Sequence, residues 1–178
     1  MKATGIVRRI DDLGRIVIPK EIRKTMHINE GDPLEIYTQS EGEIILKKYS
    51  PMGELRSFAE HHATALSKII NIPVIICDRD SIIAVAGMSK REIIGKPISQ
   101  ELKNILQKRQ IYIIQKNKTL YPTQEMTNNI LVCSPIISSG DLNGAIIFLS
   151  TNSLFSANEI YIKLAQLSAM ILAQQISG

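Results

Sequence analysis

Seven of the lysines and arginines lie within the first 24 residues of this 178-residue chain, where their side chains can bind phosphate groups. Only three acidic residues accompany them, so this segment carries a net charge of +4, whereas residues 25–50 carry −3. A basic face attracts nucleic acid through phosphate contacts, and Arg can also read guanine through paired hydrogen bonds. On charge alone, a solvated surface with ion pairs is the more common explanation.

Short strands and one helix are expected to position these basic side chains. Asp11–Gly14 is a turn signal, because Asp caps turns and Gly accepts a positive φ. Pro19 ends a β-branched run and suits the first turn of a helix, which we expect over Lys20–His27. The expected strands cover residues 5–10, 15–18, 34–37 and 44–46, the last two joined by a turn at residues 40–42.

This N-terminal segment is too small to bury a stable core by itself. A segment below about 50 residues without a metal or disulfide usually needs a partner. Two copies that exchange hairpins would supply the missing core, so we expect residues 1–50 to form an obligate dimer.

The motifs GIVR, D-x-LGR-[IV]-VIP and EIR occur in order over nearly all of residues 1–50. In these motifs the chain closely resembles the AbrB-type transition-state regulators of spore-forming bacteria. The resemblance implies a mainly β, swapped-hairpin dimeric barrel that binds double-stranded DNA.

The same resemblance assigns DNA contacts to individual residues. The arginines of the three motifs are Arg8, Arg15 and Arg23. Lys24 stands where the family often has arginine, and because it lacks the planar guanidinium fork, a phosphate contact is expected there. The full set of expected DNA-binding residues is Arg8, Arg9, Arg15, Arg23, Lys24 and Lys2, with Arg9 and Lys2 on the DNA backbone. The fold also serves antitoxins, whose short flexible tails wrap a toxin. The apolar 128 residues that follow residue 50 are instead expected to fold.

Tyr49–Gly53 is the expected boundary, and residues 54–178 are expected to form an α+β domain with an antiparallel sheet. Helices are expected over residues 54–70 and 98–107 and from Ser156, where Ser156 and Glu159 form a capping box. In the first helix, Leu55, Phe58, Ala59, His62, Leu66 and Ile69 share one face. Strands are expected over residues 74–77, 82–86, 111–114, 130–137 and 145–149, the last two joined by a loop over 138–144.

This element order, with phrases such as NGAIIF, resembles a GAF domain, a small sensor module. The two halves together resemble sporulation regulators that join an AbrB-type domain to a GAF-like domain. That resemblance implies a tetramer that activates and represses forespore genes.

Two apolar stripes run along the last predicted helix. One contains Ile160, Leu164, Leu167 and Ile171. The other, with coiled-coil spacing, contains Ile162, Ala165, Ala169, Leu172 and Ile176. We expect the second stripe to be the oligomerisation seam and the first to cover the domain's own sheet.

The C-terminal half shows no motif for a metal, a cofactor or catalysis. An unidentified small molecule can be held by the loops Gly87–Pro97 and Ile114–Asn129, as in other GAF-like domains. Residues 90–118 carry a net charge of +6, for which a solvated face is the more common explanation. Cys77 and Cys133 lie in apolar strands and are expected to be buried, reduced thiols. We therefore expect that the protein is not an enzyme. A GAF-type thiol enzyme is the less favoured alternative.

The composition of the whole chain indicates the class of protein. With 44% apolar and 21% charged residues, the chain should be globular. It shows no signal peptide, and the longest apolar stretch, residues 69–77, is too short for a bilayer span, so we expect a cytoplasmic protein without membrane contact. The sequence predicts a homo-oligomeric, DNA-binding transcriptional regulator.

Overall fold

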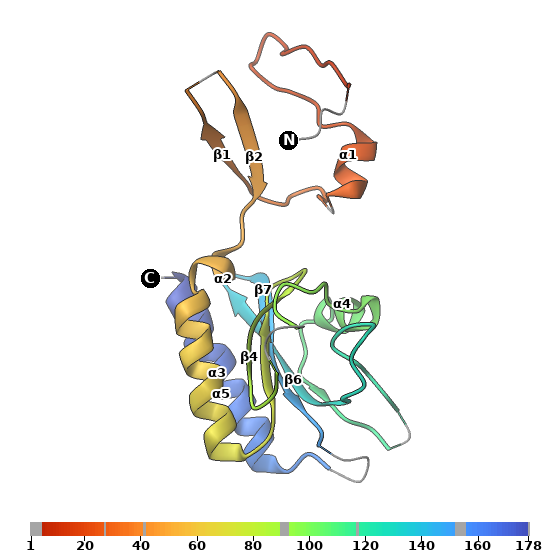
Figure 1. Ribbon diagram of the computed structural model, residues 1–178, viewed down its shortest axis with the longest axis vertical. Helices are drawn as coiled ribbons and strands as arrows, with labels where there is room; N and C mark the ends of the chain where they lie inside the picture. The colour runs from red at the N-terminus through yellow and green to blue at the C-terminus, as the bar shows by residue number, and fades with distance from the viewer. Residues whose placement is uncertain are drawn as a thin grey trace. The chain divides into compact units, whose positions relative to one another are not determined.

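The computed structural model describes residues 5–26, 28–40, 42–89, 93–116, 118–151 and 156–177. The chain divides into two compact units, Met1–Tyr49 and Ser50–Gly178 (Figure 1). Each unit has its own sheet, one with two strands and the other with five.

The first unit contains one helix and one hairpin. The helix α1 spans Lys20–Thr25, and strands β1 (Leu34–Thr38) and β2 (Ile44–Lys48) pair antiparallel, with Leu34 opposite Lys48. The predicted hairpin is therefore confirmed, with strands slightly longer than expected. The helix was predicted too long, since Met26 already forms its C-cap, and His27 lies outside the described residues. Pro19 occupies the N-cap position, one residue before the predicted place.

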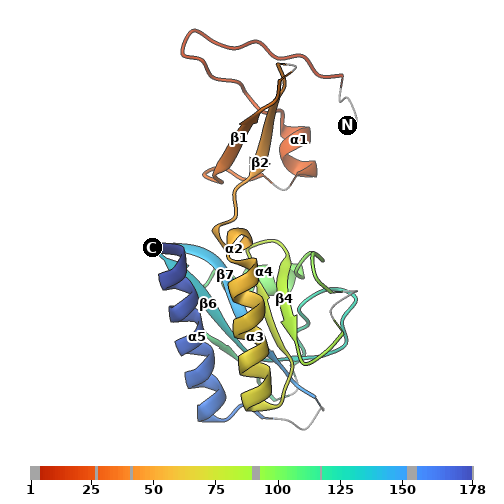
Figure 2. The same ribbon diagram turned by 60° about the vertical axis from the view of Figure 1, so that its left-hand side comes forward.

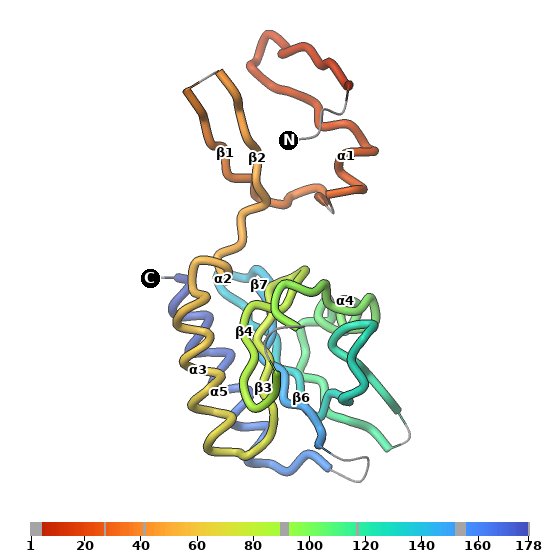
Figure 3. The backbone as a smooth tube through the Cα atoms, viewed as in Figure 1, coloured from red at the N-terminus to blue at the C-terminus, as the bar shows by residue number. Residues whose placement is uncertain are grey.

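The predicted strands over residues 5–10 and 15–18 do not form part of a sheet in the single chain. Residues 5–19 instead run out and back as an open loop, red in Figure 3. A β-strand exists through backbone hydrogen bonds to a neighbouring strand. Within the described ranges, these residues have no neighbouring strand to pair with.

The second unit is built on a five-stranded antiparallel sheet with strand order β4-β3-β7-β6-β5. The strands are β3 (Val74–Cys77), β4 (Ile82–Ala86), β5 (Tyr112–Ile113), β6 (Ile130–Ser138) and β7 (Asp141–Leu149). The helices are α2 (Pro51–Glu54), α3 (Arg56–Ile70), α4 (Gln100–Leu106) and α5 (Glu159–Ser177). Helices α3 and α5 lie side by side on one face of the sheet (Figures 1 and 2), and α4 lies on the other, so the predicted α+β architecture is confirmed.

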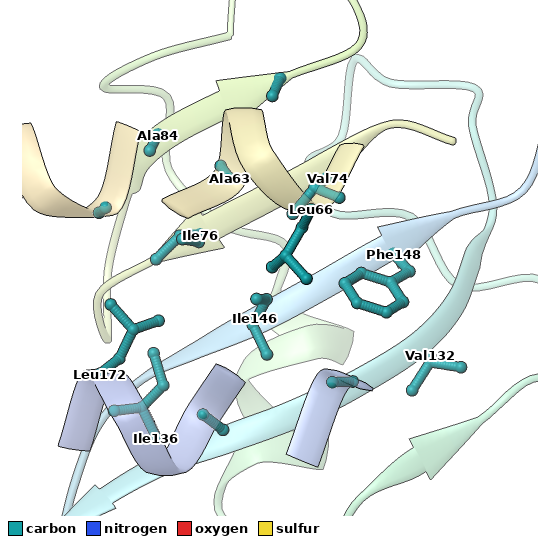
Figure 4. Close-up of a cluster of buried hydrophobic side chains, with 14 of the residues drawn as sticks. Ala63, Leu66, Val74, Ile76, Ala84, Val132, Ile136, Ile146, Phe148 and Leu172 are labelled. Atoms are coloured by element: carbon teal, nitrogen blue, oxygen red, sulfur yellow. The ribbon is translucent and has the colours of Figure 1, made fainter. Parts of the chain in front are cut away.

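The sheet of the second unit is buried on both faces. Along β3, Val74 and Ile76 face α3 and α5, whereas Ile75 and Cys77 face α4, as the two-residue period of a strand requires. Figure 4 shows the first of these cores, where Phe148 and the neighbouring aliphatic side chains pack between sheet and helices. Burial on both faces explains why these strands read as continuous apolar runs.

The predicted face of helix α3 is confirmed for Ala59, Leu66 and Phe58, but not for Ile69. Ala59, Ala63, Leu66 and Ile70 are buried, but Ile69 is 73% exposed. The two alanines allow the helix backbone to approach the sheet closely, which rotates Ile69 outward. The helix also begins at Arg56, because the short helix α2, capped by the Ser50 hydroxyl, precedes it.

The connection between β6 and β7 is a tight turn instead of the predicted seven-residue loop. Ser138 pairs with Asp141, which leaves only Ser139 and Gly140 in the turn, with φ values of 52° and 84°. Positive φ at both central residues is typical of the hairpin turns that match strand twist. Gly144 consequently lies within β7, where a Cβ atom would come 2.0 Å from the Cys77 carbonyl oxygen.

The cap and the two stripes of α5 also differ from the prediction. Asn158, and not Ser156, caps the helix, because its Oδ1 accepts a hydrogen bond from Tyr161 N at 2.9 Å. The stripe predicted as an oligomerisation seam packs on the domain's own sheet. Its members Ala165, Ala169 and Leu172 are buried, and Ile162 and Ile176 pack against the same core. In the other stripe, Ile160 and Leu167 are exposed, whereas Leu164 packs against the core.

Candidate nucleic-acid interface

Asp11 organises the turn that carries Arg15. Its Oδ1 accepts hydrogen bonds from the backbone N–H groups of Leu13 (3.0 Å) and Arg15 (2.8 Å). Its Oδ2 accepts one from Arg15 Nε at 2.8 Å, and its own N–H donates to the Arg15 carbonyl at 3.1 Å. Gly14, with φ of +76°, completes the reversal of the chain. The Arg15 guanidinium is thereby held at the turn while most of its surface stays exposed.

The same contacts change the pKa of the Asp11 carboxyl group. The backbone and side-chain hydrogen bonds from Arg15 lower the pKa of Asp11 below its usual value. Asp11 is therefore ionised at neutral pH and remains an acceptor for Arg15. The turn pattern predicts only a turn role for Asp11, whereas its spacing of four residues from Arg15 is a signal in the sequence for this ion pair.

The other predicted DNA-binding residues lie on the same unit. Arg8 and Arg9 lie on the open loop, whereas Arg23 and Lys24 lie in the last turn of α1. All four are exposed, as is Arg15, and Lys2 lies outside the described residues. Five cationic groups are thus available to an anionic partner from one small unit.

Apolar side chains in the first unit are also exposed. Val7 is 86% exposed, and Pro19 is the only buried residue within the described part of this unit. The large apolar residues exposed here are Ile6, Val7, Ile10, Leu13, Ile16, Val17, Met26, Ile36, Tyr37, Ile44 and Leu46. Exposed apolar area of this extent marks an interaction surface.

Several basic residues of segment 90–118, in the second unit, form contacts within that unit. Lys96 forms an ion pair with Glu125, and Lys103 pairs with Asp80 at 2.8 Å. Arg109 donates to the Gly140 carbonyl at 2.7 Å, while Lys90 and Arg91 lie outside the described residues. These contacts favour the interpretation of this segment as a structural, solvated face.

The two cysteines are buried in the second core. Burial, reinforced by the charge of Asp78, raises the pKa of Cys77 to about 12. Burial also raises the pKa of Cys133 well above its usual value. Both groups are therefore neutral thiols at pH 7, and since the thiolate is the nucleophile, their setting argues against thiol catalysis.

No described helix is both long and apolar enough to cross a bilayer. The described residues also contain no group of three His, Cys, Asp or Glu side chains arranged to hold a metal ion.

Comparison with known proteins assigns the family. The family model of the stage V sporulation protein T C-terminal, transcription factor, matches residues 54–177. Stage V sporulation protein T of Bacillus subtilis (strain 168) is 44% identical over 178 residues, which cover 99% of each chain. This chain belongs to the stage V sporulation protein T family. A second family model, antidote-toxin recognition MazE, bacterial antitoxin, matches residues 7–54.

The first unit of this chain is also similar to a further relative and to a solved domain. The transition state regulatory protein AbrB of Bacillus subtilis (strain 168) is 63% identical over 51 residues, which cover 29% of this chain and 52% of AbrB. The solution structure of the N-domain of the transcription factor abrB is 63% identical over 29% of this chain and 96% of that domain, with a TM-score of 0.27.

Two solved structures, one of them a GAF domain, resemble this chain in fold. The cofactor binding GAF domain of the nutrient sensor CodY from Clostridium difficile has a TM-score of 0.51 at 16% identity, covering 88% of this chain and 94% of that one. A methyl-accepting chemotaxis protein fragment has a TM-score of 0.57 at 17% identity, covering 70% and 90%. The second unit therefore has a GAF-like fold.

Proposed function

We propose that this protein is a transcriptional regulator of sporulation genes, both activator and repressor, whose first unit binds double-stranded DNA as a dimer. The carrying observation is the coincidence, in one small unit, of five exposed cationic residues and almost no buried core. The protein's membership of the stage V sporulation protein T family supports the regulatory role. The proposed place of action is the cytoplasm of the forespore.

Hairpin exchange between two copies accounts for the exposed apolar residues. The open loop of residues 5–19 carries backbone groups and β-branched side chains suited to a sheet, and a second copy can pair with both. Dimerisation would place two sets of basic residues on one assembly, which doubles the charge that faces DNA.

The motif arginines are the proposed base-reading residues. Arg8, Arg15 and Arg23 can each form two hydrogen bonds to guanine, whereas Arg9, Lys24 and Lys2 are proposed to contact phosphates. Because Asp11 restrains the Arg15 side chain before DNA arrives, less freedom is lost when that contact forms.

A tetramer is proposed to form through the outward face of the second unit's helices. Ile160, Leu167 and Met170 of α5 and Ile69 of α3 are exposed there. This set replaces the predicted seam, which packs on the domain's own sheet. Pairing two DNA-binding dimers would raise affinity for two half-sites through effective concentration.

The test is fluorescence anisotropy with duplex DNA across a salt series. Arg15→Ala should weaken binding by about tenfold or more, in line with about 1–3 kcal/mol for a bidentate base contact. Arg56→Ala, which removes an exposed arginine from the second unit, is the matched control and should leave affinity unchanged. Equal affinities for the two folded variants would refute the assignment of Arg15.

An antitoxin function is the second candidate, because residues 7–54 match the MazE model. It predicts a tight complex with a toxin and a flexible tail. The folded GAF-like second unit favours the regulator, and saturable, salt-dependent binding to duplex DNA would decide for it.

A further inference from the structure

The chain between the two units is held by one unit or the other up to a single peptide bond. Tyr49, the last residue of the first unit, donates its backbone N–H to the Pro33 carbonyl of the same unit at 3.0 Å. Ser50, the first residue of the second unit, is the N-cap of α2, and its Oγ accepts a hydrogen bond from Gly53 N at 3.2 Å. The connection therefore has no free residue, only the backbone rotations on either side of that bond.

Asp78, in the turn between β3 and β4, also holds Ser50. The Ser50 hydroxyl donates to Asp78 Oδ2 at 3.1 Å, although 28 residues separate the two in the sequence. The other carboxylate oxygen, Oδ1, accepts from the backbone N–H groups of Asp80 at 2.8 Å and Ser81 at 2.6 Å. The turn thus uses one oxygen of Asp78, and the second oxygen contacts Ser50.

The sheet fixes the position of Asp78. Its backbone N–H donates to the Ser81 carbonyl at 3.0 Å, and the preceding residue, Cys77, is the fully buried last residue of β3. Strand β3 lies inside the sheet, paired with β4 on one side and β7 on the other. Ser50 is therefore bonded to a rigid element of the second unit.

The two residues after Ser50 restrict the same segment further. A residue that precedes proline is confined to extended backbone, and Ser50, before Pro51, has φ of −131° and ψ of 103°. Met52 is fully buried in the core that α3 and α5 share with the sheet. The start of the second unit is thus anchored by packing and by hydrogen bonds, and Ser50 is the anchored residue nearest to the first unit.

The length of a tether decides which distances two linked binding modules can bridge. A long flexible tether bridges many distances with little preference, whereas a short one accepts few. Each released residue adds at most about 3.3–3.6 Å, so the release of Ser50 and Pro51 would lengthen the connection by about 7 Å. That length corresponds to about two base-pair steps of roughly 3.4 Å along DNA.

We propose that Asp78, acting through Ser50, is a positioning residue for DNA recognition. By holding Ser50 it keeps the connection short, so that the two DNA-binding dimers of the proposed tetramer accept only a narrow range of spacings between their sites on DNA. The anchoring of Ser50 stands on the geometry of the second unit alone. Its consequence for spacing rests on the proposed function, in which paired dimers bind duplex DNA.

The test uses the full chain and duplex DNA. The wild-type protein first selects a site from random duplexes. The probes then carry one copy of this site, or two copies moved apart one base pair at a time over about two helical turns of about 10.5 bp each. A second copy should raise wild-type affinity by about 100-fold at the best spacing and by at least about tenfold less at the poorest. An equal gain at every spacing would overturn the proposal.

Ser50→Ala is the decisive variant, because it removes the hydroxyl that contacts Asp78. The difference in affinity between the best and the poorest spacing should fall at least about threefold, while affinity for a single site stays unchanged. Asp78→Asn should act in the same direction, since the amide keeps an acceptor for the turn but loses Oδ2. Ser50→Thr keeps the hydroxyl and should retain the wild-type profile. An unchanged profile in Ser50→Ala would refute the role of Ser50.

Two further proteins control for tether length and for general effects. Insertion of Gly-Ser-Gly-Ser between Tyr49 and Ser50 lengthens the connection directly and should abolish the spacing preference. Ser57→Ala, which removes an exposed hydroxyl from α3, should leave the profile unchanged. A spacing preference that survives the insertion would show that tether length is not the cause.

The readouts separate this proposal from a structural role and from the proposed function. Profiles are measured well below the melting temperature of each variant, because a merely structural role would lower that temperature without changing the profile. Absence of binding to single-site DNA by the wild type would refute the proposed function and the spacing role with it. Single-site binding with no gain, or with a gain independent of spacing, would refute the spacing role alone.

Discussion

The two units of this protein bury their apolar side chains to very different extents. In the first unit, Pro19 is the only buried residue that the structure describes, and Val7 and Val17 lie in the open. In the second unit, every residue of β3 and β4 is buried, between helices on one face and α4 with its loops on the other. Both segments are rich in Ile and Val, so composition alone does not separate them.

The difference lies in whether one chain can supply both sides of a core. The second unit has two long helices to cover its sheet, whereas the first has one six-residue helix with no buried residue. The second unit can therefore fold independently, and we propose that the first depends on association. Association would bring basic residues of two copies together, which would link the stability of the first unit to its proposed DNA binding.

The largest expected effect is on the independent core. Phe148→Ala removes a fully buried ring between the sheet and the helices and should lower the free energy of unfolding of the second unit by about 3–5 kcal/mol. Denaturant unfolding with circular dichroism would measure it. Phe148→Leu, which keeps more of the volume, should cost less. A loss equal in both variants would show that packing at this position is not the cause.

A charge in the open loop tests the dependence of the first unit on a partner. Val17 is exposed in the single chain, so Val17→Asp should cost nothing to an isolated copy. In the proposed dimer the carboxylate would be buried, and dimerisation and DNA binding should both be lost. Analytical ultracentrifugation of residues 1–53 and anisotropy on the full chain would measure these losses. Val17→Ile is the control, and an intact Val17→Asp dimer would refute the exchanged-hairpin arrangement.

The sequence predicts the hairpins and strands well because they depend on local patterns. The alternation in β1, the apolar start of β2 and the apolar runs of β3 and β4 required no tertiary information. The strands over residues 5–10 and 15–18 do not form in the single chain, and in the proposed dimer they would pair with a second copy.

Other features depend on the tertiary structure. Both stripes of α5 have helical spacing, and the smaller residues Ala165 and Ala169 pack on the sheet because they permit closer approach. The exposure of Ile69 has the same origin.

A smaller effect is expected from the residue that holds Arg15. Asp11→Asn keeps an acceptor for the backbone N–H groups but loses the charged contact to the guanidinium. DNA affinity should fall by less than in Arg15→Ala, because Arg15 remains able to bind. Anisotropy at several salt concentrations would compare the two variants, with Asp12→Asn as a control of equal charge change. Tighter binding in both Asn variants would mean that removing negative charge outweighs the positioning of Arg15.

The smallest expected effect is a pH dependence confined to the second unit. His62 on α3 stacks on Phe58 with ring centroids 5.8 Å apart, and its Nε2 is buried without a hydrogen-bond partner within the described residues. Burial lowers the pKa of His62 below its usual value of about 6.5, so the unfolded chain binds this proton more readily than the folded one. Stability should therefore be complete above about pH 6.5 and fall as the pH drops below it. Denaturant unfolding of the second unit at several pH values would show this slope, and His62→Gln should reduce it. An unchanged slope in that variant would assign the dependence to another group.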